Sequence, residues 1–77
     1  MASDTENTIR IYIRLLDEGT EVSRPTSALD LGNGLFRVLP TPDYDPDDEA
    51  WEFPPGSLVR CNRKISRDGE YLLAVKA

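Results

Sequence analysis

The stretch TIRIYIRLL, from Thr8 to Leu16, decides the fold. Aliphatic residues occupy every second position, and three of those four residues are isoleucine. Strict alternation with β-branched residues on one face is typical of a half-buried β-strand, so the stretch predicts a strand. Its inward face would be Ile9, Ile11, Ile13 and Leu15, and its opposite face Arg10, Tyr12, Arg14 and Leu16.

Turn residues divide the chain that follows into four more expected strands. Asp17 to Thr20 has turn chemistry, and Asn33-Gly34 supplies the positive φ angles of a tight hairpin turn. Pro25 cannot donate to a sheet ladder, so it implies an edge or a bulge in the second strand. Pro54-Pro55-Gly56 makes a later turn. The expected strands are Val22 to Asp30, Leu35 to Leu39, Ser57 to Ile65 and Glu70 to Lys76.

The register of the last hairpin follows from which residues it would bring to one face. A two-residue Asp68-Gly69 turn would set Ile65 opposite Leu72 and mix polarity on both faces. A three-residue loop, Arg67 to Gly69, collects most of the apolar residues on one face, so we expect this second register. It pairs Ile65 with Tyr71, Arg63 with Leu73 and Cys61 with Val75.

Five short strands without a convincing ten-residue helix predict an all-β fold. Residues 1–7 are polar and unpatterned and would form a flexible N-terminus, which leaves 8–77 as a single domain. An open five-stranded sheet would leave an apolar face uncovered in so short a chain. The expectation is therefore a small five-stranded antiparallel barrel, or a strongly bent sheet, with an acidic proline-rich loop.

Two resemblances support this expectation. The segment FPPGSLV, from Phe53 to Val59, resembles the proline-glycine turn that enters a strand in many SH3-like barrels. The run from Ile11 to Val75, with RLLDEGT at 14–20, Arg24-Pro25 and WEFPPG at 51–56, resembles a group of short bacterial proteins of uncharacterised activity. The resemblance implies a compact module and assigns no site.

Composition narrows the function classes. The chain has 77 residues, 14 acidic against 9 basic side chains, no histidine and one cysteine. Common zinc sites and the Ser-His-Asp and Cys-His systems are therefore out of reach within one chain, and a chain this short has little room for a buried pocket. We expect no enzyme and no cofactor. Without a secretory signal or an apolar run long enough to span a bilayer, the default expectation is a cytoplasmic protein away from the membrane.

The segment PTPDYDPDDE, residues 40–49, is the strongest candidate site. Its prolines suit a surface loop, with one helical turn after Pro46. Aspartates at 43, 45 and 47 are similar to the start of a calcium loop, but Asp48 stands where the invariant glycine belongs and Pro54 where a bidentate glutamate belongs. Calcium stays an alternative, as does a merely solvated acidic loop. The docking interpretation gives these residues to a basic protein partner: Asp43, Tyr44, Asp45, Asp47, Asp48, Glu49 and Trp51.

The acidity is local. Residues 43–52 hold six of the 14 acids and no base, so the remainder of the chain is close to neutral. The global acidic balance argues against sequence-independent binding of nucleic acid, which depends on neutralising phosphates. Four of the nine bases nevertheless lie within eight residues, at Arg60, Arg63, Lys64 and Arg67.

Seven of the nine bases are arginine, whose planar fork recognises phosphate or carboxylate. Two guanidiniums flanking Tyr12 would suit a nucleotide, although a solvated strand face explains them as well. In this alternative the ligand is an anionic small molecule, held between subunits by Arg10, Tyr12, Arg14, Arg24 and Arg60.

Structural roles are also open for Trp51, Phe53 and Cys61. Trp51 and Phe53 suit a core or a lid, although a tryptophan also serves as an anchor for a partner. Cys61 is expected to face inward and to be inert. The sequence thus favours a non-catalytic inhibitor or adaptor, physically comparable to anti-toxin, immunity or phage counter-defence proteins. The alternative is an oligomeric binder of an anionic ligand such as a signalling nucleotide.

Overall fold

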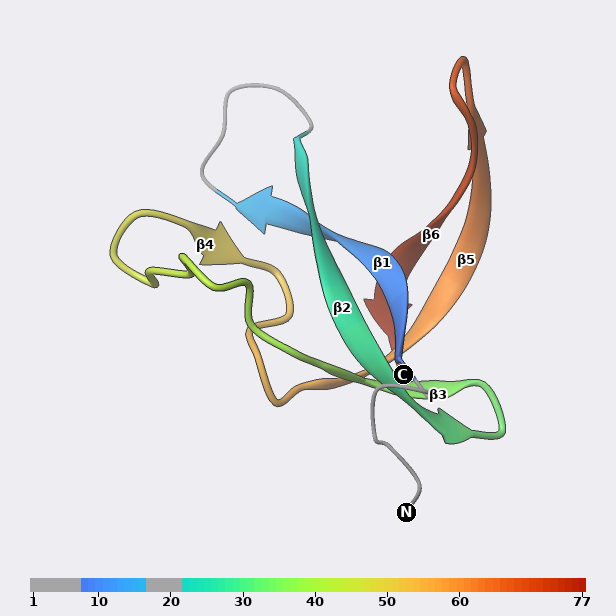
Figure 1. Ribbon diagram of the computed structural model, residues 1–77, viewed down its shortest axis with the longest axis horizontal. Coiled ribbons are helices and arrows are strands. Elements are labelled where there is room, and N and C mark those ends of the chain that lie inside the picture. The colour runs from blue at the N-terminus through green and yellow to red at the C-terminus, as the bar shows by residue number, and fades with distance from the viewer. Residues whose placement is uncertain (1–7, 17–21) are drawn as a thin grey trace.

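A computed structural model describes residues 8–16 and 22–77, so the expected flexible terminus at 1–7 and the turn at 17–20 lie outside the described residues. The described residues contain strands and turns and no helix. Figure 1 shows how the strands curve around a common centre. The strands are β1 (Thr8–Leu16), β2 (Ser23–Gly32), β3 (Leu35–Val38), β4 (Ala50–Trp51), β5 (Leu58–Ser66) and β6 (Gly69–Lys76).

The sheet closes into a ring because β1 has neighbours on both edges. On one edge it pairs with β2 from Thr8 to Arg14 in antiparallel register. The chain of pairings then runs through β3, β5 and β6, and β6 returns to β1 at Tyr12 and Leu73. This last pairing is parallel. The expectation of a wholly antiparallel sheet is therefore wrong at the junction that closes the ring, where the first and last strands run in the same direction.

The described part of the chain contains six strands where five were expected. The additional strand is β4, which pairs with the end of β1 through Leu15 with Trp51 and Leu16 with Ala50. Two residues are too few for an alternating pattern to show, so only tertiary pairing defines this strand. β4 is not one of the five strands of the ring, and its pairing fixes Ala50 and Trp51 against the end of β1.

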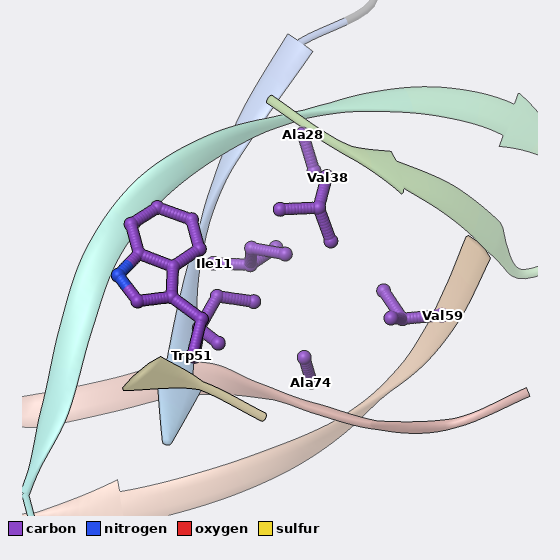
Figure 2. Packing of buried hydrophobic residues seen from close by; sticks show 7 residues of the cluster. Ile11, Ala28, Val38, Trp51, Val59 and Ala74 are labelled. Carbon is purple, nitrogen blue, oxygen red and sulfur yellow. The ribbon is translucent and has the colours of Figure 1, made fainter. Parts of the chain in front are cut away.

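One core fills the interior of the ring (Figure 2). The predicted inward face of β1 is confirmed, since Ile11 and Ile13 are fully buried while Ile9 and Leu15 pack against the cluster from its margin. Trp51 is 4% exposed and belongs to the same cluster. Each strand contributes at least one residue to the core, which comprises Ile11, Ile13, Ala28, Val38, Trp51, Val59 and Ala74.

The predicted Asn33-Gly34 turn is confirmed. Asn33 has φ 57° and Gly34 φ 80°, and Gly32 pairs with Leu35 across them. Both central residues of this turn type require positive φ, which asparagine and glycine tolerate best. Pro25 lies opposite Tyr12, in a part of β2 that precedes the β2–β3 pairing at Ala28, as expected for an edge position. The irregularity of β2 lies instead between Asp30 and Gly32.

The predicted register of the β5–β6 hairpin is wrong. The turn consists of Arg67 and Asp68 alone, and Ser66 pairs with Gly69. Both expected registers placed Gly69 inside the turn, whereas in the structure Gly69 begins β6 with φ 122°. The Ser66 hydroxyl stabilises the shorter turn, because its oxygen accepts from the Asp68 amide and donates to the Gly69 carbonyl, both at 3.2 Å. The observed pairs set Ile65 opposite Glu70, Arg63 opposite Leu72 and Cys61 opposite Ala74.

Candidate functional site

Residues 43–49, which we call the acidic turn, connect β3 to β4 and contain no strand. Asp45 organises the backbone of this segment: its carbonyl accepts from the amides of Asp48 and Glu49 at 3.0 Å. Its side-chain Oδ1 accepts from the Asp47 amide at 2.9 Å, as an N-cap residue does. Pro46 follows at the first position, where a missing N–H costs nothing. These contacts form the single helical turn that the sequence predicts.

Glu49 ties the acidic turn to the body of the protein. One of its carboxylate oxygens, Oε2, forms an ion pair with the guanidinium of Arg24 on β2. The other, Oε1, accepts from the indole Nε1–H of Trp51 at 2.9 Å. The side chain is only 17% exposed. Glu49 therefore has a structural role, and a partner would not reach its carboxylate without breaking these bonds.

Tyr44 provides a second attachment. Its ring meets that of Trp51 edge to face, with centroids 4.6 Å apart and planes inclined at 64°. It packs against the core cluster, and its amide donates to the carbonyl of Thr41 at 3.1 Å. Tyr44 is half-buried, so part of its surface is accessible beside the carboxylates.

Three carboxylates of the acidic turn face solvent, and their side chains form no hydrogen bond or ion pair among the described contacts. Asp43, Asp47 and Asp48 are exposed. Asp45 is exposed as well, but its side chain caps the turn. The sequence interpretation assigned all seven residues to one partner-binding surface. The structure instead gives Asp45, Glu49 and Trp51 structural roles. Trp51 in particular is not presented, because burying its large ring in the core is what holds the turn in place.

The five residues of the alternative ligand site do not meet at one place. Arg10, Tyr12 and Arg14 share the outer face of β1. Arg24 stands opposite Ile13 on β2 and is paired with Glu49. Arg60, on β5, donates from Nη1 to the Asn33 carbonyl at 3.1 Å and so supports the β2–β3 turn. Arg24 and Arg60 are engaged in two separate parts of the fold.

A hollow of about 300 Å³ does lie beside Tyr12, between the outer face of β1 and the β5–β6 turn. Tyr12 and Tyr71 meet there edge to face, with ring centroids 5.2 Å apart. Its charged lining residues are Asp68 and Glu70, both acidic. A hollow with this lining repels a phosphate, so it gives the nucleotide interpretation no direct support.

The surface that the sequence interpretation did not select is the outer part of the β5–β6 hairpin. Every residue from Asn62 to Glu70 is exposed. Arg63, Lys64 and Arg67 lie close in sequence to Ile65, which is 79% exposed. The clustering of bases in this segment was visible in the sequence, but Ile65 was expected on the apolar face, whereas the hairpin carries it beyond the core although it lies at alternate positions with the buried Val59.

The predicted inward orientation of Cys61 agrees with the structure, where it packs against the core cluster. Burial raises the pKa of its thiol, so the reactive thiolate is scarcer at neutral pH than for an exposed cysteine. Over residues 8–16 and 22–77 no three His, Cys, Asp or Glu side chains lie close enough to hold a metal ion. Within the same residues, no helix is long and apolar enough to cross a membrane.

Comparisons of this chain with protein-family models, with curated proteins and with solved structures find no match.

Proposed function

We propose that this protein is a non-catalytic binding module that engages a basic surface of another macromolecule through its acidic turn. One observation carries the proposal. Asp43, Asp47 and Asp48 are exposed on a backbone that Glu49 and Tyr44 attach to the core. The carboxylates therefore face solvent on a backbone segment that is attached to the core.

The attachment matters for affinity as well as for shape. A loop that is ordered only on binding loses conformational entropy at that moment, whereas a loop held in place beforehand loses little. Exposed carboxylates within one turn also accelerate encounter with a basic surface, an effect that weakens as salt screens the charges. The arrangement favours a fast, salt-sensitive association.

An apolar contact beside the carboxylates comes from Tyr44. Since Trp51 is buried, the half-buried Tyr44 ring is the aromatic surface of the acidic turn that a partner would cover. Tyrosine at such a position contributes apolar area and a hydroxyl at low entropic cost. The proposed contact is thus one aromatic edge with three carboxylates around it.

The test compares two variants that lose the same number of carboxylates. The turn variant carries Asp43→Asn, Asp47→Asn and Asp48→Asn, and the control carries Asp30→Asn, Asp68→Asn and Glu70→Gln at exposed positions elsewhere. Proteins captured from a native host extract are quantified for the wild type and both variants. The partner should be lost by the turn variant, kept by the control, and released as salt rises. Capture that is indifferent to salt and to the turn substitutions would refute the proposal.

Within this class we favour an inhibitor or adaptor of the anti-toxin, immunity or phage counter-defence type, and an SH3-like barrel as the fold category. The support is indirect: a small all-β module, a closed ring of strands, and a Pro54-Pro55-Gly56 turn in which Gly56 has φ 93°. The partner identified by capture decides between these types.

The alternative, an oligomeric protein that sequesters an anionic small molecule, draws less support. Arg24 is engaged by Glu49 and Arg60 by the Asn33 carbonyl, and the charged residues that line the hollow beside Tyr12 are Asp68 and Glu70. Thermal melting against a nucleotide panel tests it, since a ligand at a hundred times its Kd stabilises by about 2.7 kcal/mol. A melting temperature unchanged by every nucleotide would eliminate this alternative.

A further inference from the structure

The outer part of the β5–β6 hairpin, residues 60–72, forms a ribbon whose outer strand edges have no strand partner among the described residues, although Tyr71 contacts Tyr12 and Arg60 donates to the Asn33 carbonyl. β5 pairs with β3 only through Leu58 and Val59, and β6 pairs with β1 only at Leu73. Figure 1 shows the hairpin diverging from β1 and β2 toward its tip. We call residues 60–72 the basic ribbon. A two-stranded ribbon with two free edges is marginally stable by itself and is readily covered by another surface.

The basic ribbon carries a net charge opposite in sign to that of the acidic turn. It contains four of the nine bases and two acids, for a formal charge of +2, while the rest of the chain carries −7. Near its tip, Arg63 lies on the same face of β5 as the exposed Ile65, Lys64 lies on the opposite face, and Arg67 lies in the turn. The ion pair that the ribbon offers internally is weak, since Arg63 Nε and Glu70 Oε1 are 3.9 Å apart and both side chains are mostly exposed.

We propose that the basic ribbon of one copy docks on the acidic turn of a second copy. This inference rests on the proposed function and names the basic surface that the acidic turn binds. Arg63, which shares a face with Ile65, and Arg67 in the turn would face Asp43, Asp47 and Asp48, and Ile65 would meet the accessible edge of Tyr44. Lys64, on the other face of the ribbon, adds to the positive charge at the tip. The pairing covers the most exposed large aliphatic side chain of the described residues.

The placement of the two surfaces fits a closed dimer. In Figure 1, drawn with the longest axis horizontal, the acidic turn before β4 and the tip of β5–β6 lie at opposite sides of the molecule. Two copies placed side by side and antiparallel therefore bring each acidic turn to the other copy's ribbon, which creates two equivalent contacts about a two-fold axis. A single contact between one turn and one hairpin tip buries little area compared with the roughly 1,200 Å² of a stable interface, and the two-fold symmetry doubles the buried area.

Charge decides between a second copy and nucleic acid as the occupant. Two-stranded ribbons with basic side chains also enter DNA grooves, sometimes with an apolar wedge. Here, however, the chain that carries the ribbon has a net charge of −5, and the ribbon contains Asp68 and Glu70. A ribbon of charge +2 neutralises few phosphates and so gains little affinity for nucleic acid, whereas its charge is complementary to that of the short acidic turn.

The experiment measures mass in solution by sedimentation or light scattering for charge-reversed variants. The turn-reversed variant is Asp43→Lys, Asp47→Lys and Asp48→Lys, and the ribbon-reversed variant is Arg63→Glu, Lys64→Glu and Arg67→Glu. The wild type should approach twice the chain mass at an ionic strength of about 0.02 M and return to the monomer mass at about 0.5 M. Each variant alone should be monomeric, and an equimolar mixture of the two should again form a dimer.

A matched control separates the ribbon from overall charge. Arg10→Glu, Arg37→Glu and Lys76→Glu reverse three exposed bases outside the ribbon and give the same net charge as the ribbon-reversed variant. This control should remain dimeric under conditions in which the ribbon-reversed variant is monomeric. A monomeric wild type at low salt, or equal loss in the control, would overturn the inference. So would a wild type that stays monomeric while its ribbon retards a short DNA duplex.

These outcomes are independent of the test of the proposed function. If mass measurements show only monomers while the acidic turn still captures a basic host protein, the inference fails and the proposed function stands. If the turn variant captures the same proteins as the wild type, the proposed function fails whatever the oligomeric state.

Discussion

Glu49 and Trp51 are joined by a hydrogen bond of 2.9 Å from the indole Nε1 to the carboxylate Oε1, so a residue of the acidic turn is bonded to the hydrophobic core. The same carboxylate pairs with Arg24 through its other oxygen. An acidic segment that composition alone marks as a surface loop is therefore attached at its end to the interior. This relationship separates the carboxylates that hold the turn from those that are free to bind.

Replacing Glu49 by alanine should destabilise the protein by about 1–3 kcal/mol, because it leaves the indole N–H and the Arg24 guanidinium without their partner. Glu49→Gln retains an oxygen for the indole and should cost less. Urea unfolding followed by Trp51 fluorescence measures both. The control is Asp48→Ala, an exposed carboxylate in the same turn. Equal stabilities for Glu49→Ala and Asp48→Ala would show that the attachment is energetically unimportant.

Truncation of two isoleucines on strands should change the free energy of unfolding by very different amounts. Ile13 is fully buried, so Ile13→Ala should cost about 2–5 kcal/mol through lost transfer free energy and the cavity it leaves. Ile65 is 79% exposed, and Ile65→Ala should change the free energy of unfolding by less than about 0.5 kcal/mol. The comparison is made by chemical denaturation at protein concentrations where the chain is monomeric. A large loss from Ile65→Ala would place that residue in the core and contradict its exposure near the tip of the hairpin.

The β2–β3 turn should tolerate one substitution and resist another. Gly34 has φ 80°, and an added Cβ would lie 3.0 Å from Arg60 Nη1. Gly34→Ala should therefore destabilise by about 1–2 kcal/mol, mainly through backbone strain, since the arginine end is flexible. Asn33→Gly keeps a residue that accepts φ 57° and should be within a few tenths of a kcal/mol of wild type. Thermal or urea unfolding distinguishes them, and a neutral Gly34→Ala would argue against this turn.

Cys61 should be slow to alkylate near neutral pH. Burial raises the pKa of its thiol above the ordinary 9.0, which lowers the thiolate fraction. The folded state favours the protonated thiol, so its contribution to stability is fully present below the unfolded pKa and is lost as pH rises through the folded pKa. Stability relative to Cys61→Ala should thus fall only at alkaline pH. Iodoacetamide kinetics with and without urea provide the check, and equal rates would contradict burial.

Local patterns were enough for the parts of the fold in which neighbouring residues decide. The alternation in Thr8–Leu16 predicted the buried face of β1, and Asn33-Gly34 predicted a two-residue turn. The proline at 46 with aspartates around it predicted one helical turn, which the Asp45 carbonyl closes. In each case the deciding interaction lies within a few residues along the chain.

The errors arose where distant segments decide. β6 pairs with β1 at Leu73, and the adjacent residues Leu73 and Ala74 are both buried. Because both faces of β6 are therefore partly buried, a register chosen to collect apolar residues on one face was wrong. β4 is a strand only because Leu15 and Leu16 lie beside it. Trp51 suited either a lid or an anchor in the sequence, and the space inside the ring assigned it to the core.

The sequence by itself determined that the chain would be all-β, with its charge excess confined to residues 43–52, because alternation, turn residues and charge are properties of local order along the chain. Tertiary structure alone decided that the Glu49 carboxylate is not free. Closure of the ring buries Trp51, whose indole N–H donates to Glu49, and Arg24 on β2 pairs with the other oxygen of Glu49. Because Asp45 is used in its local cap, Asp43, Asp47 and Asp48 remain facing solvent. The physical reason is that the buried indole N–H requires a partner, while the core that buries it and the arginine that pairs with Glu49 come from strands distant in sequence.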